Sequence, residues 1–391
     1  MPSPNKPGPW PIEYLPTADG ARIACKRRPA AGTPVIFLHG LAVNADLWDI
    51  PEIAGDGFRF RSLARLLHEA GHDIWLVNLR GHGGPSMLSE PPAGQEDWCL
   101  DHFIVHDLPA VVDHVWTRSG RRPFVAANSM GAMTAAGYLQ GATLAGTGAD
   151  CRVTCDPELA ERRQQKLSGC VLIEFPAALR WPQSMYDGDG NVNWREFLRD
   201  WHRTTSDRNY AFELLARLGW LEAFVASAGG VRLEWLRPKK GLRPLREELP
   251  EPLAEAVSWT ERALAAAGKF YATKLKGAEN FCVETFLGGL LYAVDHMKAG
   301  VLRQLAKSVR ARGFVSDVGQ PDHDYVEHYP RIALPTLVVL GGRDRIANAD
   351  VTRETFFERI AARDKTLALF DNLAHGEFEY APAAYELVYP R

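Results

Sequence analysis

The stretch Pro123-Phe-Val-Ala-Ala-Asn-Ser129-Met-Gly131 decides the fold. It runs from apolar residues typical of a buried strand, through Ser129, into a helical pattern of small residues at 131–140. A serine on such a sharp strand-to-helix turn is lifted above the edge of a sheet, and small residues two positions before and after it let the two backbones approach. Gly131 meets this requirement fully, whereas Ala127 stands where a glycine is usual. The stretch therefore predicts a strained turn that presents the Ser129 hydroxyl. A serine that merely caps a helix is the simpler alternative, but it explains none of the residues that follow.

Short apolar runs on both sides of this stretch predict further strands. These runs cover residues 12–15, 21–26, 34–38, 73–77, 169–173, 335–340 and 366–370, and helical patterns cover 60–70 and 103–116. Short apolar strands that alternate with helices build a parallel sheet covered on both faces. We therefore expect an α/β protein with a mostly parallel, doubly wound sheet.

The alternation of strands and helices breaks between residues 173 and 335. This interval has helical patterns at 194–201, 211–226, 253–267 and 286–309, and it carries six of the eleven tryptophans. We interpret it as a large helical cap inserted before the penultimate core strand. The expected division is a core at 1–175 and 332–391 with the cap at 176–331. The cap tryptophans are expected to form the cap's own core, and those that face Ser129 would favour an apolar acyl group or a bulky alcohol.

Two polar residues near the C-terminus complete a catalytic pattern. A serine hydroxyl needs an adjacent base to become a nucleophile, and in doubly wound hydrolases the chain order is serine, acid, histidine. Asp344 comes just after the strand at 335–340, and His375 lies in the loop after the strand at 366–370. Functional groups gather at the carboxyl ends of parallel strands. We therefore predict Ser129, Asp344 and His375 as a catalytic triad, with Asp350 as a competitor for the place of the acid.

The loop after the strand at 34–38 predicts the remaining part of the site. Acyl transfer requires backbone amides that point at the negative charge of the tetrahedral intermediate. The amide of Met130, directly after the serine, is one expected donor. The loop His39-Gly40-Leu41 supplies the second, and we assign it to Leu41.

These motifs together resemble the α/β-hydrolase superfamily of the serine esterase and lipase type. The resemblance rests on His39-Gly-Leu-Ala, Ile74-Trp-Leu-Val-Asn78, Arg80-Gly-His82, the turn at Ser129, Gly342-Arg-Asp344 and His375-Gly376. The first two are particularly similar to acid lipases and their bacterial relatives, and there is a looser likeness to polyhydroxyalkanoate synthases. The chain departs from those synthases because Ser129 stands where they have a cysteine. The resemblance implies a serine carboxylic-ester hydrolase that acts on an apolar, lipid-like or small-molecule ester and needs no cofactor.

Two other functions stay open at this stage. A thioesterase or acyltransferase would use the same triad with a different donor or acceptor. A ligand-binding protein could keep the fold without turnover, although the intact triad argues against it.

Three further polar patterns are weaker. Asp187, Asp189, Asn193 and Glu196 resemble the later part of a calcium-binding loop, but Met185 stands where the first carboxylate is needed, so a polar turn is the better interpretation. His102 and His106 have the spacing of a zinc pair but lack a third ligand, and we expect an ordinary pair on a helix surface. The loop at 237–252 mixes Lys239, Lys240, Arg243 and Arg246 with glutamates, which favours a solvated loop over a phosphate site. No metal is expected.

Composition limits the classes of partner. A net charge of −3 gives no general attraction to nucleic acid, and no stretch approaches the roughly 20 apolar residues of a membrane helix.

Cysteine usage and the N-terminal residues bear on the cellular compartment. The six cysteines are too scattered for a disulfide framework, and Cys151 and Cys155 are expected as ordinary thiols. The N-terminal residues lack the apolar segment of a signal peptide. We expect a cytoplasmic protein, with secretion after removal of a signal peptide left open. The sequence says nothing about the oligomeric state.

Overall fold

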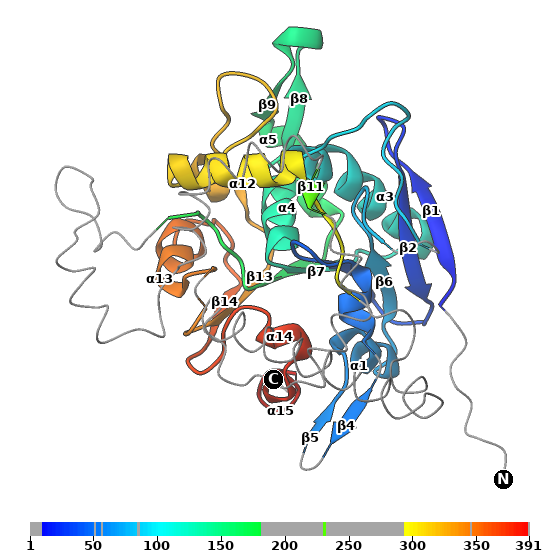
Figure 1. Ribbon diagram of the computed structural model, residues 1–391. Helices are drawn as coiled ribbons and strands as arrows, with labels where there is room; N and C mark the ends of the chain where they lie inside the picture. The colour runs from blue at the N-terminus through cyan, green and yellow to red at the C-terminus, as the bar shows by residue number, and fades with distance from the viewer. Residues whose placement is uncertain are drawn as a thin grey trace, which may run out of the picture.

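In the part of the chain that the structure describes, an eight-stranded sheet forms the centre of the protein (Figure 1). The computed structural model describes residues 10–50, 52–55, 58–83, 87–180, 230–231, 293–344 and 346–389. Within them the strand order of the large sheet is β1-β2-β6-β3-β7-β10-β13-β14. These strands are β1 Ile12–Pro16, β2 Arg22–Arg28, β3 Pro34–Leu38, β6 Asp73–Val77, β7 Phe124–Asn128, β10 Gly169–Ile173, β13 Thr336–Gly341 and β14 Lys365–Phe370.

The six strands from β6 to β14 are parallel, and only β1 and β2 run antiparallel to their neighbours. Strand β3 pairs with β6 on one side and with β7 on the other, so the chain changes direction across the sheet at β3. The loops after β3 and β7 therefore meet at a switch point, which is where ligands bind in open α/β sheets. The expected mostly parallel, doubly wound sheet is confirmed.

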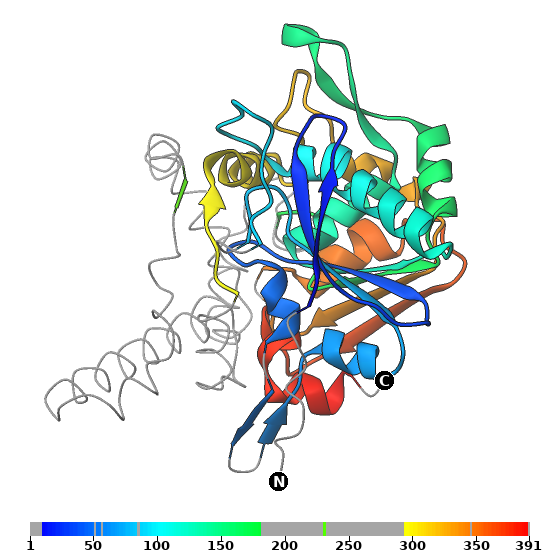
Figure 2. The same cartoon turned by 90° about the vertical axis from the view of Figure 1, so that its right-hand side faces the viewer.

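Helices cover both faces of the sheet (Figures 1 and 2). The longer ones are α1 Leu63–Glu69, α3 Leu108–Ser119, α4 Met130–Leu139, α5 Pro157–Gln165 and α12 Ala299–Ala311, and the shorter ones are α2 Leu100–His102, α13 Ala349–Thr352, α14 Glu377–Tyr380 and α15 Pro382–Leu387. The alternation of buried residues in β3 shows the two faces. Ile36 and Leu38 belong to the core that contains residues of α3 and α4, whereas Val35 and Phe37 belong to the core that contains residues of α1 and α14.

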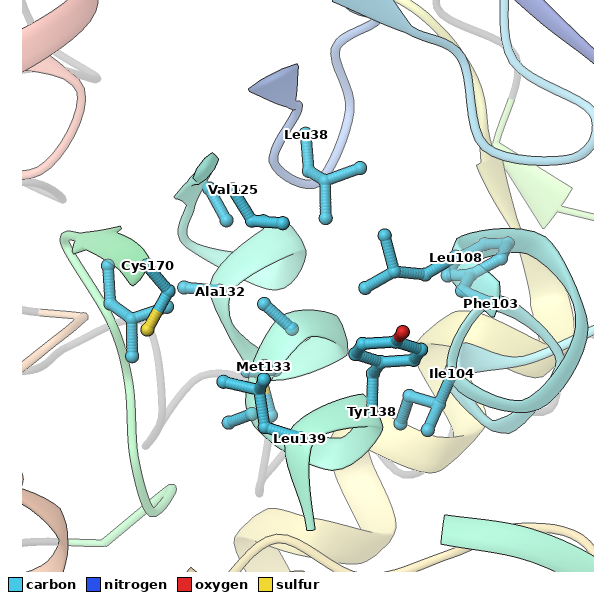
Figure 3. Close-up of a cluster of buried hydrophobic side chains, with 14 of the residues drawn as sticks. Leu38, Phe103, Ile104, Leu108, Val125, Ala132, Met133, Tyr138, Leu139 and Cys170 are labelled. Atoms are coloured by element: carbon cyan, nitrogen blue, oxygen red, sulfur yellow. The ribbon is translucent and has the colours of Figure 1, made fainter. Parts of the chain in front are cut away.

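Helix α4 is buried on all sides, which explains its small residues. All ten of its residues are buried, and Figure 3 shows Ala132, Met133 and Tyr138 packed among side chains of the sheet and of the helix at 103–119. A helix surrounded by protein needs apolar residues around its whole circumference. At Gly137 an added Cβ would lie 2.7 Å from Ile104 Cδ1, so a larger residue there would require Ile104 to move.

Short elements that the apolar patterns did not predict lie between the main ones. They are the hairpins β4 Ile53–Gly55 with β5 Phe58–Phe60 and β8 Ala142–Ala145 with β9 Arg152–Cys155, and the 3₁₀ turns Ala45–Asp49, Gly148–Asp150 and Tyr325–Arg331.

Two predicted helices have other bounds in the structure. The helix expected at 60–70 begins only at Leu63, because Phe60 pairs with Ile53. The helix expected at 103–116 is longer: α2, a π-helical turn at Phe103–Asp107 and α3 follow one another.

The end of the expected cap packs on the core. The helix predicted at 286–309 begins at Ala299 within the described residues, because Met297–Lys298 forms the short strand β12, which pairs with β11 Gly230–Val231. Val301, Leu305 and Tyr329 belong to the same core as α4. The six cap tryptophans, the calcium-like loop at 187–196 and the basic loop at 237–252 lie outside the described residues, and the domain boundaries stay a prediction.

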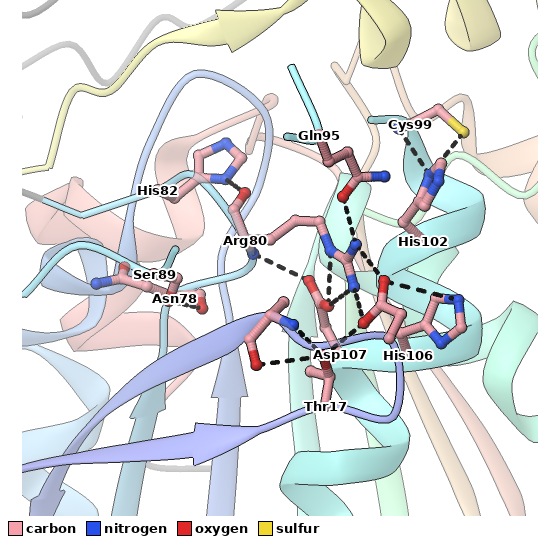
Figure 4. A network of polar contacts seen from close by, with 12 residues as sticks. Thr17, Asn78, Arg80, His82, Ser89, Gln95, Cys99, His102, His106 and Asp107 are labelled. Carbon is pink, nitrogen blue, oxygen red and sulfur yellow. Dashed lines mark hydrogen bonds and ion pairs between the residues drawn. The ribbon is translucent and has the colours of Figure 1, made fainter. Parts of the chain in front are cut away.

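A buried ion pair joins the loop after β6 to two other parts of the chain (Figure 4). The Arg80 side chain is fully buried, and it donates to Asp107 Oδ1 at 2.7 Å and to Asp19 Oδ2 at 2.7 Å. Asp107 ends the π-helical turn, and Asp19 lies in the turn between β1 and β2. Loss of one partner of a buried pair leaves an uncompensated charge. Arg80 thus fixes the path of the chain beyond β6.

Within the described residues, no helix has the length and apolarity needed to cross a bilayer.

Candidate active site

Ser129 occupies the turn between β7 and α4 in a conformation that L-amino acids rarely adopt. Its φ is 49° and its ψ is −113°. Such a backbone costs on the order of 1–3 kcal/mol and persists only where the surroundings hold it. The Ser129 amide donates to Ile173 O at 2.9 Å, and the Ser129 carbonyl accepts from the Met133 amide at 3.1 Å. The end of β10 and the first turn of α4 therefore hold the serine in place.

Two glycines let the loop after β3 approach this turn. At Gly131 an added Cβ would lie 2.7 Å from the carbonyl oxygen of His39. At Gly40 it would lie 2.4 Å from Asn128 Oδ1 and 3.3 Å from Ser129 Cβ. Both gaps are too small for a methyl group, so the backbone of residues 39–41 lies directly against the serine. Ala127 fits in β7, where it is fully buried.

His375 reaches Ser129 from the loop after β14. Its Nε2 lies 3.0 Å from Ser129 Oγ, and its Nδ1 lies 2.8 Å from Asp344 Oδ2. With Nδ1–H donated to the carboxylate, Nε2 is left to accept the serine proton. The three side chains come from residues separated by as many as 246 positions, and the sheet brings them together as their order at the strand ends predicts.

Asp344 is held rigidly at the end of β13. Its Oδ1 accepts hydrogen bonds from the amides of Ile346 at 2.7 Å and Ala347 at 2.8 Å, which leaves Oδ2 for the imidazole. The competitor Asp350 lies at the start of α13, where it is exposed and pairs with Arg353 at 3.0 Å. Of the two aspartates, the described structure places Asp344 against His375.

The two predicted oxyanion donors belong to the residue after the serine and to the loop that lies against it. Met130 is the first residue of α4, so its amide has no acceptor within the helix. Leu41 follows Gly40 in the loop that touches Ser129. His39 Nδ1 lies 2.9 Å from Gly40 O, and His39 Nε2 accepts from the Leu79 amide at 3.2 Å. Because Gly40 O and the Leu41 N–H belong to the same peptide and point in opposite directions, His39 sets the direction of the Leu41 amide.

The hydrogen bonds of His39 require a neutral ring. Burial, together with the neighbouring His82, lowers the pKa of His39 to about 3. Burial also lowers the pKa of His82 to about 4. Both side chains are therefore uncharged at neutral pH, and their rings lie tilted to each other at 53°, with 4.6 Å between the ring centroids. His39 and His82 were noted in the sequence only as parts of motifs, without a structural role.

A second carboxylate next to the imidazole was missed by the sequence analysis. Glu174 follows β10 directly, is fully buried, and its Oε2 lies 3.9 Å from His375 Nδ1. It also accepts hydrogen bonds from the Gly376 amide and from Asn128 Nδ2. The signal that identified Asp344, an acidic residue just after an apolar strand, was equally present at Glu174.

Two groups of possible metal ligands occur in the described part of the chain. Glu174, Asp344 and His375 form the first, and the contact to Ser129 accounts for their arrangement. Cys155, His323 and His328 form the second, with ligand atoms within 4.8 Å of one another. Burial raises the pKa of the Cys155 thiol to about 12, and the nearby cations Arg331 and Arg163 would repel a metal ion.

His102 and His106 do not form the expected surface pair. Both are partly buried, and burial lowers the pKa of His102 to about 4. His102 Nδ1 accepts from the Cys99 amide at 3.2 Å, whereas His106 lies 3.8 Å from Asp19. The two rings therefore belong to the polar network around Arg80 (Figure 4).

Comparisons with known proteins identify the family of the chain. Residues 35–386 match the profile of the Alpha/beta hydrolase family. Gastric triacylglycerol lipase of Homo sapiens is 35% identical over 95 residues, which are 23% of this chain and 22% of the lipase. Lipase member K of Mus musculus is 29% identical over 143 residues, 35% of this chain and 31% of the lipase. The matched segments thus span less than a third of these relatives. A solved structure of a soluble variant of monoglyceride lipase from Saccharomyces cerevisiae aligns with 100% of this chain and 94% of its own, at 11% identity and a TM-score of 0.49.

Proposed function

Because the chain belongs to the α/β-hydrolase family, we propose that it is a serine hydrolase that cleaves carboxylic esters through an acyl-enzyme on Ser129. The observation that carries this proposal is the continuous row of hydrogen bonds from Ser129 Oγ through His375 to Asp344, at 3.0 and 2.8 Å. A serine that only capped a helix would not require an imidazole and a buried carboxylate in line with it.

The proposed reaction has two halves. His375 Nε2 takes the proton of Ser129 as Oγ attacks the ester carbonyl, and Asp344 stabilises the imidazolium. The amides of Leu41 and Met130 bind the oxyanion, and the imidazolium protonates the departing alcohol. Water, activated by the same imidazole, then attacks the acyl-enzyme and releases the acid. None of these steps needs a cofactor.

The proposed substrate is an apolar, lipid-like ester. Support comes from the matched relatives, which are named as lipases, and from the expected cap at residues 176–331, in which those tryptophans that face Ser129 would provide an apolar lining. A series of p-nitrophenyl esters of increasing chain length tests this part of the proposal. We expect kcat/KM to rise from acetate toward longer acyl chains, and a preference for acetate alone would contradict it.

The nucleophile is tested with Ser129→Ala. We expect kcat for activated esters to fall about 10⁴-fold or more, because the hydroxyl that forms the acyl-enzyme is missing. The variant should keep the circular dichroism spectrum of the wild type, since a small side chain is shortened without a new clash. Labelling with a fluorophosphonate should occur in the wild type and be absent in the variant. Wild-type hydrolysis rates in pure Ser129→Ala would refute the assignment.

A further inference from the structure

Glu174 combines two features that a purely structural residue at the end of a strand does not need. Its φ is 49°, in the left-handed region that favours glycine, and its carboxylate is fully buried. A strained backbone and a buried charge each cost free energy, so their coincidence at one residue suggests a functional constraint. The Glu174 amide donates to Val339 O at 2.9 Å, which ties the residue to the strand that leads to Asp344.

The side chain of Glu174 contacts the neighbours of the proposed nucleophile and of the proposed base. It accepts from Asn128, the neighbour of the nucleophile, at 2.9 Å, and from the amide of Gly376, the neighbour of the base. Its Oε2 also lies 3.9 Å from His375 Nδ1, on the side of the ring that faces Asp344. A shift of about 1 Å would bring these two atoms within hydrogen-bond distance. Hydrogen bonds from these two N–H donors offset part of the cost of burying the carboxylate.

Three further carboxylates lie near His375 and Glu174 within the described residues. Asp344 comes from the loop after β13, and Glu377 and Glu379 are buried on α14. Glu379 accepts from the same Asn128 amide at 2.6 Å, and Glu377 accepts from the Ala374 amide at 2.7 Å. Tyr389 packs behind them, where burial and the charges of Glu379 and Glu174 raise its pKa.

We propose that Glu174 is a positioning residue for His375, a second carboxylate that stabilises the imidazolium beside Asp344 and accepts its Nδ1–H when Asp344 is removed. This inference rests on the proposed function for its kinetic consequences. Its electrostatic consequence is independent of turnover, because a negative charge at this distance raises the pKa of the imidazole whether or not an ester is cleaved.

The electrostatic part is tested by NMR titration of His375 in protein labelled at histidine. Glu174→Gln keeps the shape of the side chain and removes its charge. We expect the pKa of His375 to fall by about 1–3 units, the range that a charge within about 4–6 Å produces. The acidic limb of the kcat/KM profile should move to lower pH by the same amount. Glu379→Gln is the matched control, because it removes a buried carboxylate from the same Asn128 amide and should shift the His375 pKa by less than half as much.

The positioning part is tested with a double-mutant cycle in kcat/KM. In Asp344→Ala the imidazole can turn its Nδ1–H to Glu174, so we expect a loss of about 10²-fold rather than the roughly 10⁴-fold loss of a triad that has lost its orienting carboxylate. Adding Glu174→Gln should then cost at least about 10-fold more than the same change costs in the wild type. If Glu174→Gln does not fold, Glu174→Asp, which keeps the charge, should keep the His375 pKa near the wild-type value.

The outcomes separate the two proposals. A lowered His375 pKa together with wild-type hydrolysis by Ser129→Ala would refute the serine mechanism and keep Glu174 as a partner of the imidazole. An unchanged His375 pKa in Glu174→Gln would overturn the inference. Equal costs of Glu174→Gln in the wild type and in Asp344→Ala would also overturn it, because a residue that only stabilises the loop would act equally in both backgrounds.

Discussion

Ser129 and Glu174 share an unusual backbone, with φ 49° at each. They follow directly on the neighbouring strands β7 and β10, which pair in parallel up to Asn128 and Ile173. Two adjacent parallel strands thus end in strained residues that turn their side chains toward the same imidazole. The strain is held by hydrogen bonds between the strand ends, since the Ser129 amide donates to Ile173 O and the Glu174 amide donates to Val339 O.

At the residue scale, the acid of the proposed triad can be tested with two aspartates. Asp344→Asn places an amide donor against His375 Nδ1, which forces the wrong tautomer and should lower kcat about 10⁴-fold. It should therefore be worse than Asp344→Ala. Asp350→Asn is the matched control, because this exposed side chain pairs only with Arg353 among its described contacts and should keep kcat within about twofold. Equal losses in the two asparagine variants would argue against Asp344.

At the scale of elements, the segment that leaves the expected cap lies along the loop after β3, which carries the predicted oxyanion donor Leu41. Val43 and Val294 form an antiparallel bridge, the Asn44 amide donates to Ala293 O, and the Asp295 amide donates to Ala42 O, both at 2.8 Å. Asp295 Oδ2 accepts from the Gly83 amide at 2.7 Å and from Asn44 Nδ2 at 3.1 Å. Burial alone would raise the pKa of Asp295, but its hydrogen bonds, first of all the one with the His296 side chain, lower it, so the carboxylate is charged.

We expect Asp295→Ala to loosen this contact and, with it, the loop that carries Leu41. The change leaves buried donors unsatisfied, which should lower the free energy of unfolding by about 1–3 kcal/mol. It should also lower kcat more than it raises KM, because an oxyanion donor acts in the transition state. Urea unfolding and ester kinetics measure the two effects. Asp113→Ala, which breaks an exposed pair with Lys166, serves as the control, and similar effects in both variants would speak against a special role of Asp295.

At the scale of the whole molecule, buried neutral histidines make stability depend on pH. The pKa of His82 is lowered to about 4 by burial, whereas an unfolded histidine has a pKa near 6.5. At pH values between these two pKa values, the unfolded chain binds a proton that the folded protein does not bind. The stability contributed by the neutral ring is therefore complete above about pH 6.5 and is lost as the pH falls toward about 4. His39 acts in the same direction over a wider range, with a pKa of about 3.

Urea unfolding at several pH values checks this dependence. We expect the free energy of unfolding to decrease from pH 7 to pH 4.5, with up to about 3 kcal/mol attributable to His82, since each pKa unit is worth about 1.4 kcal/mol. Burial raises the pKa of Asp101 and Asp107, which gives these carboxyls the opposite slope. The contribution of His82 is therefore read from the difference between the wild type and His82→Gln. A variant with the same pH slope as the wild type would contradict the assignment.

The strands could be predicted from the sequence because their signals are local. The apolar runs at 34–38, 73–77 and 169–173 coincide with β3, β6 and β10. The order of Ser129, Asp344 and His375 after their strands was enough to predict that they meet, because parallel strands bring their carboxyl ends to one edge. The hairpins β4–β5 and β8–β9 were missed, since neither carries the continuous apolar run that marked the central strands.

Only the tertiary structure decided which polar groups surround the imidazole. Asp344 and Glu174 carry the same local signal, a carboxylate just beyond an apolar strand, and only the distances of 2.8 and 3.9 Å to His375 Nδ1 distinguish them. The role of His39 depends likewise on the Leu79 amide, 40 residues away. Periodicity along the chain determines which residues form strands and helices. Hydrogen bonds between residues far apart in the sequence depend on how those elements pack, and a linear sequence pattern does not specify that packing.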